Sequence, residues 1–221
     1  FGVTYIGWDF VLEQVVAIKE YLPSEFATRV PGEETITIYS GEKENQFAIG
    51  KDKFADEARR LAQFNAVEGV VEIKDTFLDN DTAYIVMEFL EGETLKEKIT
   101  REGKLSPEET LPIIKSVLMT LQEVHKGDII HRDIAPDNIF LCSNGQVKLL
   151  DFGASRYATV QHSKSLSVIL KEGYAPEEQY RSKGVQGPWS DVYAVGATMY
   201  KMLTGVTPED AMERAENDKV K

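Results

Sequence analysis

Hydrophobic and polar residues alternate through much of the first part of the chain, which is the pattern of strands that bury one face. Short β-branched runs begin the chain, and turn-forming residues separate them. The last two segments flank Asp79-Asn80-Asp81 and are predicted to form a hairpin. The predicted strands are residues 3–8, 15–20, 35–39, 70–77 and 82–89.

The spacing of hydrophobic residues becomes helical in four other segments. The first follows Ser40, which is placed to cap it, and continues to Phe64. Residues 94–97 and 106–109 both have the Ser/Thr-x-x-Glu sequence of a capping box, so each predicts the start of a helix. Residues 191–203 are apolar on nearly every side, which predicts a helix in a core.

A β-rich part therefore precedes a helix-rich part, and the change falls near residues 88–92. This order predicts an α+β fold with two lobes, residues 1–89 and residues 90–221. A cleft between two such lobes is the default place for a ligand.

Composition excludes several classes of protein. The chain has 221 residues, of which 42% are hydrophobic and 28% charged, so it is neither disordered nor a low-complexity tail. Its apolar runs are too short to span a bilayer. One cysteine cannot build a disulfide framework or a cysteine-based zinc site, and favours a reducing, cytoplasmic setting. The net charge of −12 argues against a nucleic-acid partner.

Four short motifs follow one another in order. They are VAIK at residues 16–19, on a predicted strand, HRDIAPDN at 131–138, DFG at 151–153 and APE at 175–177. Each is weak evidence alone, because short patterns recur by chance. Together, and on these elements, they resemble the signature set of protein kinases.

Two further segments, residues 19–23 and 173–180, are similar to the eukaryotic-like serine/threonine kinases of bacteria in particular. The resemblance covers essentially the whole chain and implies the bilobal protein kinase fold. It also implies transfer of the γ-phosphoryl group of Mg-ATP to Ser or Thr hydroxyls of protein substrates, with the protein itself as one candidate acceptor.

The resemblance implies that Lys19 holds the α- and β-phosphates of ATP. Lys19 needs a carboxylate to fix it, for which Glu57 is the first candidate and Asp56 the alternative. Glu57 is preferred because it precedes Leu61 by one turn. In the family, a residue like Leu61 belongs to a packing spine with Ile73, His131 and Phe152.

The same resemblance assigns the catalytic groups of the helix-rich part. Asp151 and Asn138 would each bind magnesium, a hard cation that prefers oxygen ligands. Asp133 would accept or orient the proton of the substrate hydroxyl. Asp191 resembles the residue that anchors the catalytic loop, a structural role, and His131 is expected to pack and not to shuttle protons.

Adenine is expected to lie against the crossover between the lobes. The backbones of Glu88 and Leu90 would offer hydrogen bonds, and Met87 would close the back of the pocket. The residues that the resemblance places around the nucleotide are Gly2, Thr4, Ala17, Lys19, Glu57, Met87, Glu88, Leu90 and Phe140.

The catalytic loop departs from the family pattern. Kinases that act on serine and threonine usually carry a Lys that touches the γ-phosphate two residues after the catalytic Asp, but this chain has Ala135. The Thr that usually bonds to this Lys is replaced by Leu170. The substitution removes one cation from the group that stabilises the transition state, and such an interaction can contribute several kcal/mol.

The chain also departs from the pattern at its ends and in one insertion. Only residues 1–2 match the glycine-rich loop, and the last helices of the family are missing, so we expect truncation at both ends. The stretch from Lys19 to Glu57 is longer than in most kinases. It is either a surface for regulation or a solvated elaboration.

Arg132 next to Asp133 suggests control by phosphorylation, because such an Arg usually pairs with a phosphorylated residue in the activation segment. The candidate phosphosites are Ser155, Thr159, Ser163, Ser165 and Ser167.

Two other functions remain open. Ala135 favours a nucleotide-binding pseudokinase that acts as a scaffold or switch, whereas the full set of Lys19, Asp133, Asn138 and Asp151 favours an enzyme. A small-molecule phosphotransferase is disfavoured by the APE segment.

Overall fold

The computed structural model describes residues 2–152, 170–181 and 184–218. The chain divides into two compact units, with the main division between Leu90 and Glu91. The first unit contains described residues 2–66 and 71–90, and the second contains 67–70 and the described residues from 91 onward. The candidate phosphosites between Ser155 and Ser167 lie outside the described residues.

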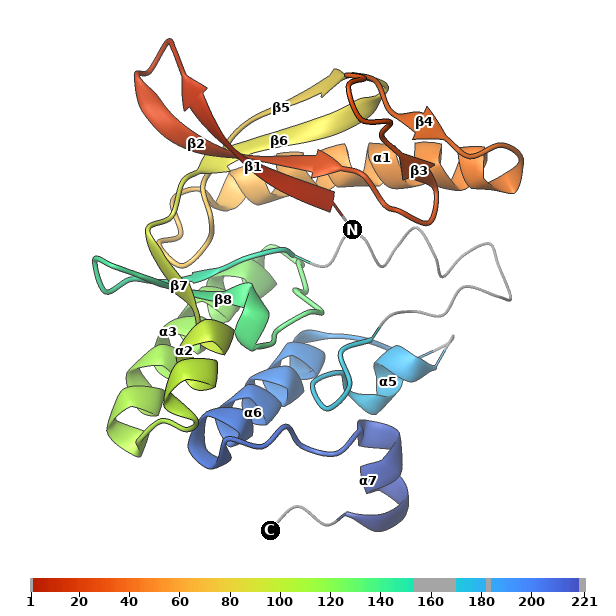
Figure 1. The fold of residues 1–221 in the computed structure, drawn as a ribbon. Coiled ribbons are helices and arrows are strands. Elements are labelled where there is room, and N and C mark those ends of the chain that lie inside the picture. The colour runs from red at the N-terminus through yellow and green to blue at the C-terminus, as the bar shows by residue number, and fades with distance from the viewer. Residues whose placement is uncertain (1, 153–169, 182–183, 219–221) are drawn as a thin grey trace. The chain divides into compact units, whose positions relative to one another are not determined.

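The first unit is built on a four-stranded antiparallel sheet with the long helix α1 (Glu42–Leu61) against it (Figure 1). A 3-10 turn, η1 (Ala62–Phe64), continues the helix, as the spacing predicts. The strands lie in the order β1 (Gly2–Asp9), β2 (Gln14–Tyr21), β6 (Thr82–Glu88) and β5 (Ile73–Asp79).

Aromatic side chains join α1 to this sheet. The Tyr21 ring centroid lies 5.1 Å from that of Phe47 and 5.5 Å from that of Phe54. These rings belong to a buried cluster that includes Ile85 of β6 and Ala58. Burial of large aromatic groups of this kind stabilises a fold strongly, so Tyr21 fixes one end of β2 on the helix.

Two predictions about this unit are wrong in detail. Ser40 does not cap α1, because the cap residue is Gly41, whose φ of 81° is one that glycine adopts readily. The predicted strand 35–39 shrinks to β4 (Thr37–Ile38), which forms a two-stranded sheet with the two-residue strand β3 (Ala27–Thr28). The part of the insertion between β2 and α1 is therefore mostly loop, and α1 itself forms the rest, from Glu42 onward.

The second unit is mainly helical. It contains a three-stranded sheet in the order β7 (Gly92–Thr94), β8 (Ile139–Cys142) and β9 (Val147–Leu149). Among its helices, α3 packs against α6. Its helical elements are α2 (Leu95–Glu102), α3 (Pro107–Lys126), η2 (Pro136–Asn138), α5 (Glu177–Tyr180), α6 (Pro188–Thr204) and α7 (Ala211–Asn217).

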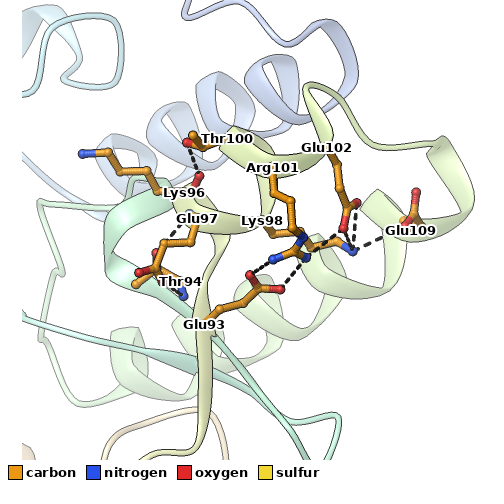
Figure 2. A network of polar contacts seen from close by, with 9 residues as sticks. All are labelled: Glu93, Thr94, Lys96, Glu97, Lys98, Thr100, Arg101, Glu102 and Glu109. Atoms are coloured by element: carbon orange, nitrogen blue, oxygen red, sulfur yellow. Dashed lines mark hydrogen bonds and ion pairs between the residues drawn. The ribbon is translucent and has the colours of Figure 1, made fainter.

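Both predicted capping boxes are confirmed. The hydroxyl of Thr94 accepts a hydrogen bond from the Glu97 N–H, and the carboxylate of Glu97 accepts one from the Thr94 N–H. Ser106 and Glu109 bond in the same way at the start of α3. The charged side chains around α2 then form a surface network, which Figure 2 shows around Glu93, Lys98, Arg101, Glu102 and Glu109.

The helix predicted at residues 191–203 is confirmed as α6 and begins slightly earlier. It ends at Gly205, which has a left-handed φ of 76°. Its buried residues include three polar ones, Ser190, Asp191 and Thr198. A buried carboxylate in a helix needs donors, and those donors lie in the candidate site.

Candidate active site

The carboxylate of Asp191 anchors the loop that follows α3. It accepts hydrogen bonds from the backbone N–H of His131 at 2.9 Å and of Arg132 at 2.7 Å. The Nε2 atom of His125, near the end of α3, lies 2.7 Å from the same carboxylate. Asp191 is fully buried, so these donors replace the water that it loses on folding.

These contacts agree with the anchoring role that the resemblance implies for Asp191. The part played by His125 could not be predicted, since nothing in the sequence pairs it with a residue on another helix. Arg132, which lies between His131 and Asp133, has a left-handed φ of 66°. A non-glycine residue held in this region is strained, and such residues cluster at functional sites.

His131 lies behind Asp133 as a neutral, buried ring. Its Nε2 atom is 2.9 Å from the carbonyl oxygen of Leu150, and the Asp133 N–H donates to its Nδ1 at 3.3 Å. Burial lowers the pKa of His131 even though carboxylates lie nearby. The ring packs on Phe152 with centroids 4.4 Å apart. These contacts fix the ring and support the packing role.

Asp133 and Asn138 come together through the 3-10 turn between them. The Asn138 N–H bonds to the carbonyl of Ala135 at 2.9 Å, which closes the turn. The Asn138 Nδ2 then donates to the Asp133 carbonyl at 2.8 Å and to its Oδ2 at 2.9 Å. The amide nitrogen is therefore committed to Asp133, and this orients the amide oxygen of Asn138.

Asp151 follows β9 and Leu150, and Leu150 is bonded to the turn that contains Asn138. The Leu150 N–H donates to the carbonyl of Asn138 at 2.9 Å. Asp151 itself has a left-handed φ of 49° and is exposed. The second unit thus brings three of the four predicted catalytic residues, Asp133, Asn138 and Asp151, into one short region.

The sequence analysis missed Lys171. Its Nζ lies 2.8 Å from Oδ1 of Asp137 and 3.4 Å from Oδ2 of Asp133. Lys171 stands immediately after Leu170, the position where the family's Thr is absent. That proximity in sequence was the one available signal.

In the first unit, register places several predicted nucleotide residues on one face of the sheet. Thr4 pairs with Lys19, and Ala17 pairs with Met87. Directly opposed residues and residues two apart in a strand share a face. Thr4, Ala17, Lys19 and Met87 therefore face the same side, as does Gly2, which pairs with Tyr21.

The structure also distinguishes the two candidate carboxylates of α1. Asp56 is exposed and bonds to Arg59 at 2.6 Å, whereas Glu57 is half-buried. Glu57 lies one turn from Phe54 and Leu61, which are both buried. Glu57 is thus on the packed face of the helix, in keeping with the preference for it.

The remaining predicted nucleotide residues lie at the end of β6 and in the small sheet. The N–H of Glu88 donates to the carbonyl of Glu72 at 3.0 Å, and its carboxylate accepts from the Glu72 N–H at 2.8 Å. Leu90 is the last described residue of the first unit. Phe140 lies in β8, paired with Thr94 and Lys148.

Among the described residues, no three His, Cys, Asp or Glu side chains form a group that could hold a metal by themselves. Across the same residues, no helix is long and apolar enough to cross a membrane.

Comparisons with known proteins show the class. The protein kinase domain family matches residues 30–221. The chain belongs to this family, and its fold is the α+β protein kinase fold. It is a kinase domain of the bacterial serine/threonine type, as the following relatives show.

The serine/threonine-protein kinase PknL of Mycobacterium tuberculosis is 38% identical over 208 residues, which cover 94% of this chain and 47% of PknL. The serine/threonine-protein kinase PrkC of Bacillus subtilis is 34% identical over 209 residues, 93% of this chain and 29% of PrkC. The chain thus spans about half, or less, of these curated relatives.

A solved structure titled PpkA-294 apo form superimposes with a TM-score of 0.90 at 32% identity, over all of this chain and 77% of that one. The structure of Rad53 1–466 in complex with AMP-PNP gives a TM-score of 0.66 at 21% identity, covering 94% of this chain and 46% of that one, so it shows the fold alone.

Proposed function

We propose that the protein transfers the γ-phosphoryl group of Mg-ATP to Ser or Thr hydroxyls of protein substrates, itself among the candidate acceptors. The observation that carries this is the arrangement of Asp133 and Asn138. A carboxylate is held by an anchored loop and bonded to an amide that fixes it. A pair so constrained suits the positioning on which phosphoryl transfer depends.

Asp133 would take the proton of the attacking hydroxyl. Its Oδ2 already bonds to the Asn138 amide, so the carboxylate keeps a defined orientation before any substrate arrives. The neutral His131 behind it cannot compete as a base for this proton, because its Nε2 bonds to the carbonyl of Leu150.

Asn138 and Asp151 would hold magnesium. Both offer oxygen atoms, which suit a hard cation, and the orientation of the Asn138 amide directs its nitrogen to Asp133. Magnesium is usually bound through one or two protein ligands and completes its shell with phosphate and water, so these two oxygen ligands suit it. When bound, the ion would neutralise charge on the phosphates.

Lys19 would bind the phosphates, and Glu57 would hold Lys19 in place. The residues that would surround the nucleotide are Gly2, Thr4, Ala17, Met87, Glu88, Leu90 and Phe140. The shared face of Thr4, Ala17, Lys19 and Met87 supports this assignment. The AMP-PNP complex of Rad53 is a nucleotide-bound example of the same fold.

The direct test is phosphate transfer from labelled ATP with magnesium to a peptide library that contains Ser, Thr and Tyr, followed by phosphoamino-acid analysis. The full-length protein is compared with Asp133→Asn. General-base groups contribute roughly 10²- to 10⁴-fold, so Asp133→Asn should lose that much in kcat. The matched control Asp52→Asn changes an exposed residue of α1 and should have the rate of the wild type.

If the wild type binds ATP normally but transfers no more phosphate than Asp133→Asn, the proposal of an enzyme is contradicted. The alternative of a pseudokinase, which Ala135 favours, then remains. Label on tyrosine only would contradict the proposed acceptor class.

A further inference from the structure

The catalytic loop lacks a cation where the chemistry calls for one. Between Asp133 and Asn138 the loop carries Ile134, Ala135, Pro136 and Asp137. Ala135 is buried, with 1% of its surface exposed, and its methyl group offers no charge. Transfer of a phosphoryl group spreads negative charge over the oxygens of the moving group, and positive groups nearby stabilise it.

An ammonium group reaches this place from another segment. Lys171 lies far along the chain from the loop, yet its Nζ contacts Asp137 at 2.8 Å and Asp133 at 3.4 Å. Their side chains remain partly open, with 26% of Lys171, 20% of Asp133 and 39% of Asp137 exposed. The cation is therefore held beside the catalytic carboxylate and is still accessible.

The backbone of Lys171 is also held in place, by hydrogen bonds within its turn. Its carbonyl accepts hydrogen bonds from the N–H groups of Tyr174 and Ala175, both at 3.0 Å. Gly173 in the same turn has a φ of 81°, and a Cβ there would collide with the carbonyl of Pro208. The turn at 171–175 is thus seated against the residues before α7, and the Lys171 side chain extends from a fixed base.

There is also open space beside the ammonium. A cavity of about 490 Å³ is lined by Lys171 and Asp137 together with Lys96, Glu172, Tyr174 and Lys201. All of these residues belong to the second unit.

We propose that Lys171 supplies the cation that the catalytic loop lacks at Ala135, and that it donates a hydrogen bond to the γ-phosphoryl group during transfer. This rests on the proposed function. An ammonium has three N–H donors. One bonds to Asp137, and Asp133 lies 3.4 Å away, so a donor of Lys171 can reach a phosphoryl oxygen. The contact to Asp137 is the shorter one and holds the group in place.

The step balances without a further reactant. The substrate oxygen forms a bond to the γ-phosphorus while the bond from that phosphorus to the oxygen of ADP breaks. The hydroxyl proton goes to Asp133, and Lys171 keeps its protons throughout. Because Lys171 belongs to the segment before Ala175, this assignment makes catalysis depend on the seating of the turn at 171–175.

A different role for the same contacts is a structural or inhibitory latch, in which Lys171 only occupies Asp133. The two roles predict different results when the lysine is moved from position 171 to position 135. A latch works only from Lys171, whereas a catalytic cation can also be supplied from the loop at Ala135.

The test uses four variants of the full-length protein: Lys171→Met, Lys171→Arg, the double variant Ala135→Lys/Lys171→Met, and the control Lys104→Met at an exposed position. The expected losses in kcat are roughly 10²- to 10³-fold for Lys171→Met and less than about tenfold for Lys171→Arg, with wild-type rate for the control. The double variant should regain at least about tenfold over Lys171→Met.

A second readout needs no turnover. Calorimetry with magnesium compares the affinity for AMP-PNP with that for ADP, and only the former carries a γ-phosphoryl group. Lys171→Met should reduce the preference for AMP-PNP by roughly 10-fold and leave ADP binding unchanged, and the double variant should restore the preference. If the wild type transfers no phosphate but shows this change, the proposed function fails while the phosphate contact stands. An unchanged preference, or Lys171→Met as active as the wild type or more active, would overturn the proposal.

Discussion

Glu20 with Arg29 in the first unit and Asp133 with Lys171 in the second are both carboxylate–cation pairs, and they differ in how the carboxylate is surrounded. Glu20 is fully buried and accepts from Arg29 at 2.9 Å and from the hydroxyls of Tyr5 and Tyr84, both at 2.8 Å. Asp133 is partly exposed, and its cation lies at the longer distance of 3.4 Å.

The pKa of Glu20 reflects its closed surroundings. Burial alone would raise the pKa, but the hydrogen bonds from Arg29, Tyr5 and Tyr84 outweigh it and hold the pKa of Glu20 below its usual range. The first pair is therefore a structural clamp that ties the loop carrying Arg29 to β2. The second pair stays partly exposed, with 26% of the Lys171 side chain and 20% of the Asp133 side chain accessible, so a reacting group can approach it.

The largest effect on stability is expected for Arg29→Met. This variant leaves the Glu20 carboxylate buried without its cation, and removal of one partner of a buried pair costs about 3–5 kcal/mol. The two tyrosines remain as donors, so we expect about 3 kcal/mol in the free energy of unfolding, measured by urea denaturation. In the double variant Glu20→Gln/Arg29→Met, the charge is removed as well, and most of this loss should be recovered. If the double variant were as unstable as Arg29→Met, the loss would come from packing and the clamp interpretation would fail.

The second effect concerns the buried ring next to Asp133. The pKa of His131 is lowered by burial, so the unfolded chain binds a proton as the pH falls below about 6.5 while the folded protein does not. The stability is fully present above that pH and falls below it, by up to about 1.4 kcal/mol at pH 5.5. Urea denaturation of the wild type and of His131→Phe at pH 7.5 and 5.5 measures this.

His131→Phe should show a smaller loss than the wild type between those two pH values. An equal loss in both proteins would mean that other groups, not His131, bind the protons, and that the ring is not held neutral by its burial.

The smallest effect on stability is expected for Lys171→Met. Partly exposed ion pairs contribute about 0–1 kcal/mol, so the free energy of unfolding should fall by no more than that. Lys104→Met, at an exposed position, is the matched control. A loss of unfolding free energy as large as that of Arg29→Met would show that both pairs stabilise the fold. The proposed difference between a structural pair and a catalytic pair would then be wrong.

Local chemistry explains which parts of this structure could be predicted. The capping boxes at Thr94 and Ser106 are set by residues three apart, and the sequence predicts both correctly. The bonds between Asp133 and Asn138 also arise within one turn. The cap of α1 was misplaced because Ser40 is a good cap by residue type, whereas the chain uses the left-handed φ of Gly41.

Long-range pairs could not be predicted in this way. Lys171 lies near Asp133 because the turn at 171–175 packs against the residues before α7. Nothing in the spacing of charged residues along the sequence indicates this packing. The same holds for His125 with Asp191 and, over a shorter distance in sequence, for Arg29 with Glu20. The family resemblance identified the missing cation at Ala135, and the structure offers its replacement.

The rate of phosphate transfer per folded molecule, measured side by side for Arg29→Met and Lys171→Met of the full-length protein, tests this account most directly. The account predicts a rate within about twofold of the wild type for Arg29→Met, because its effect is on folding, and a loss of roughly 10²- to 10³-fold for Lys171→Met. Equal losses in the two variants, or a normal rate for Lys171→Met, would contradict it.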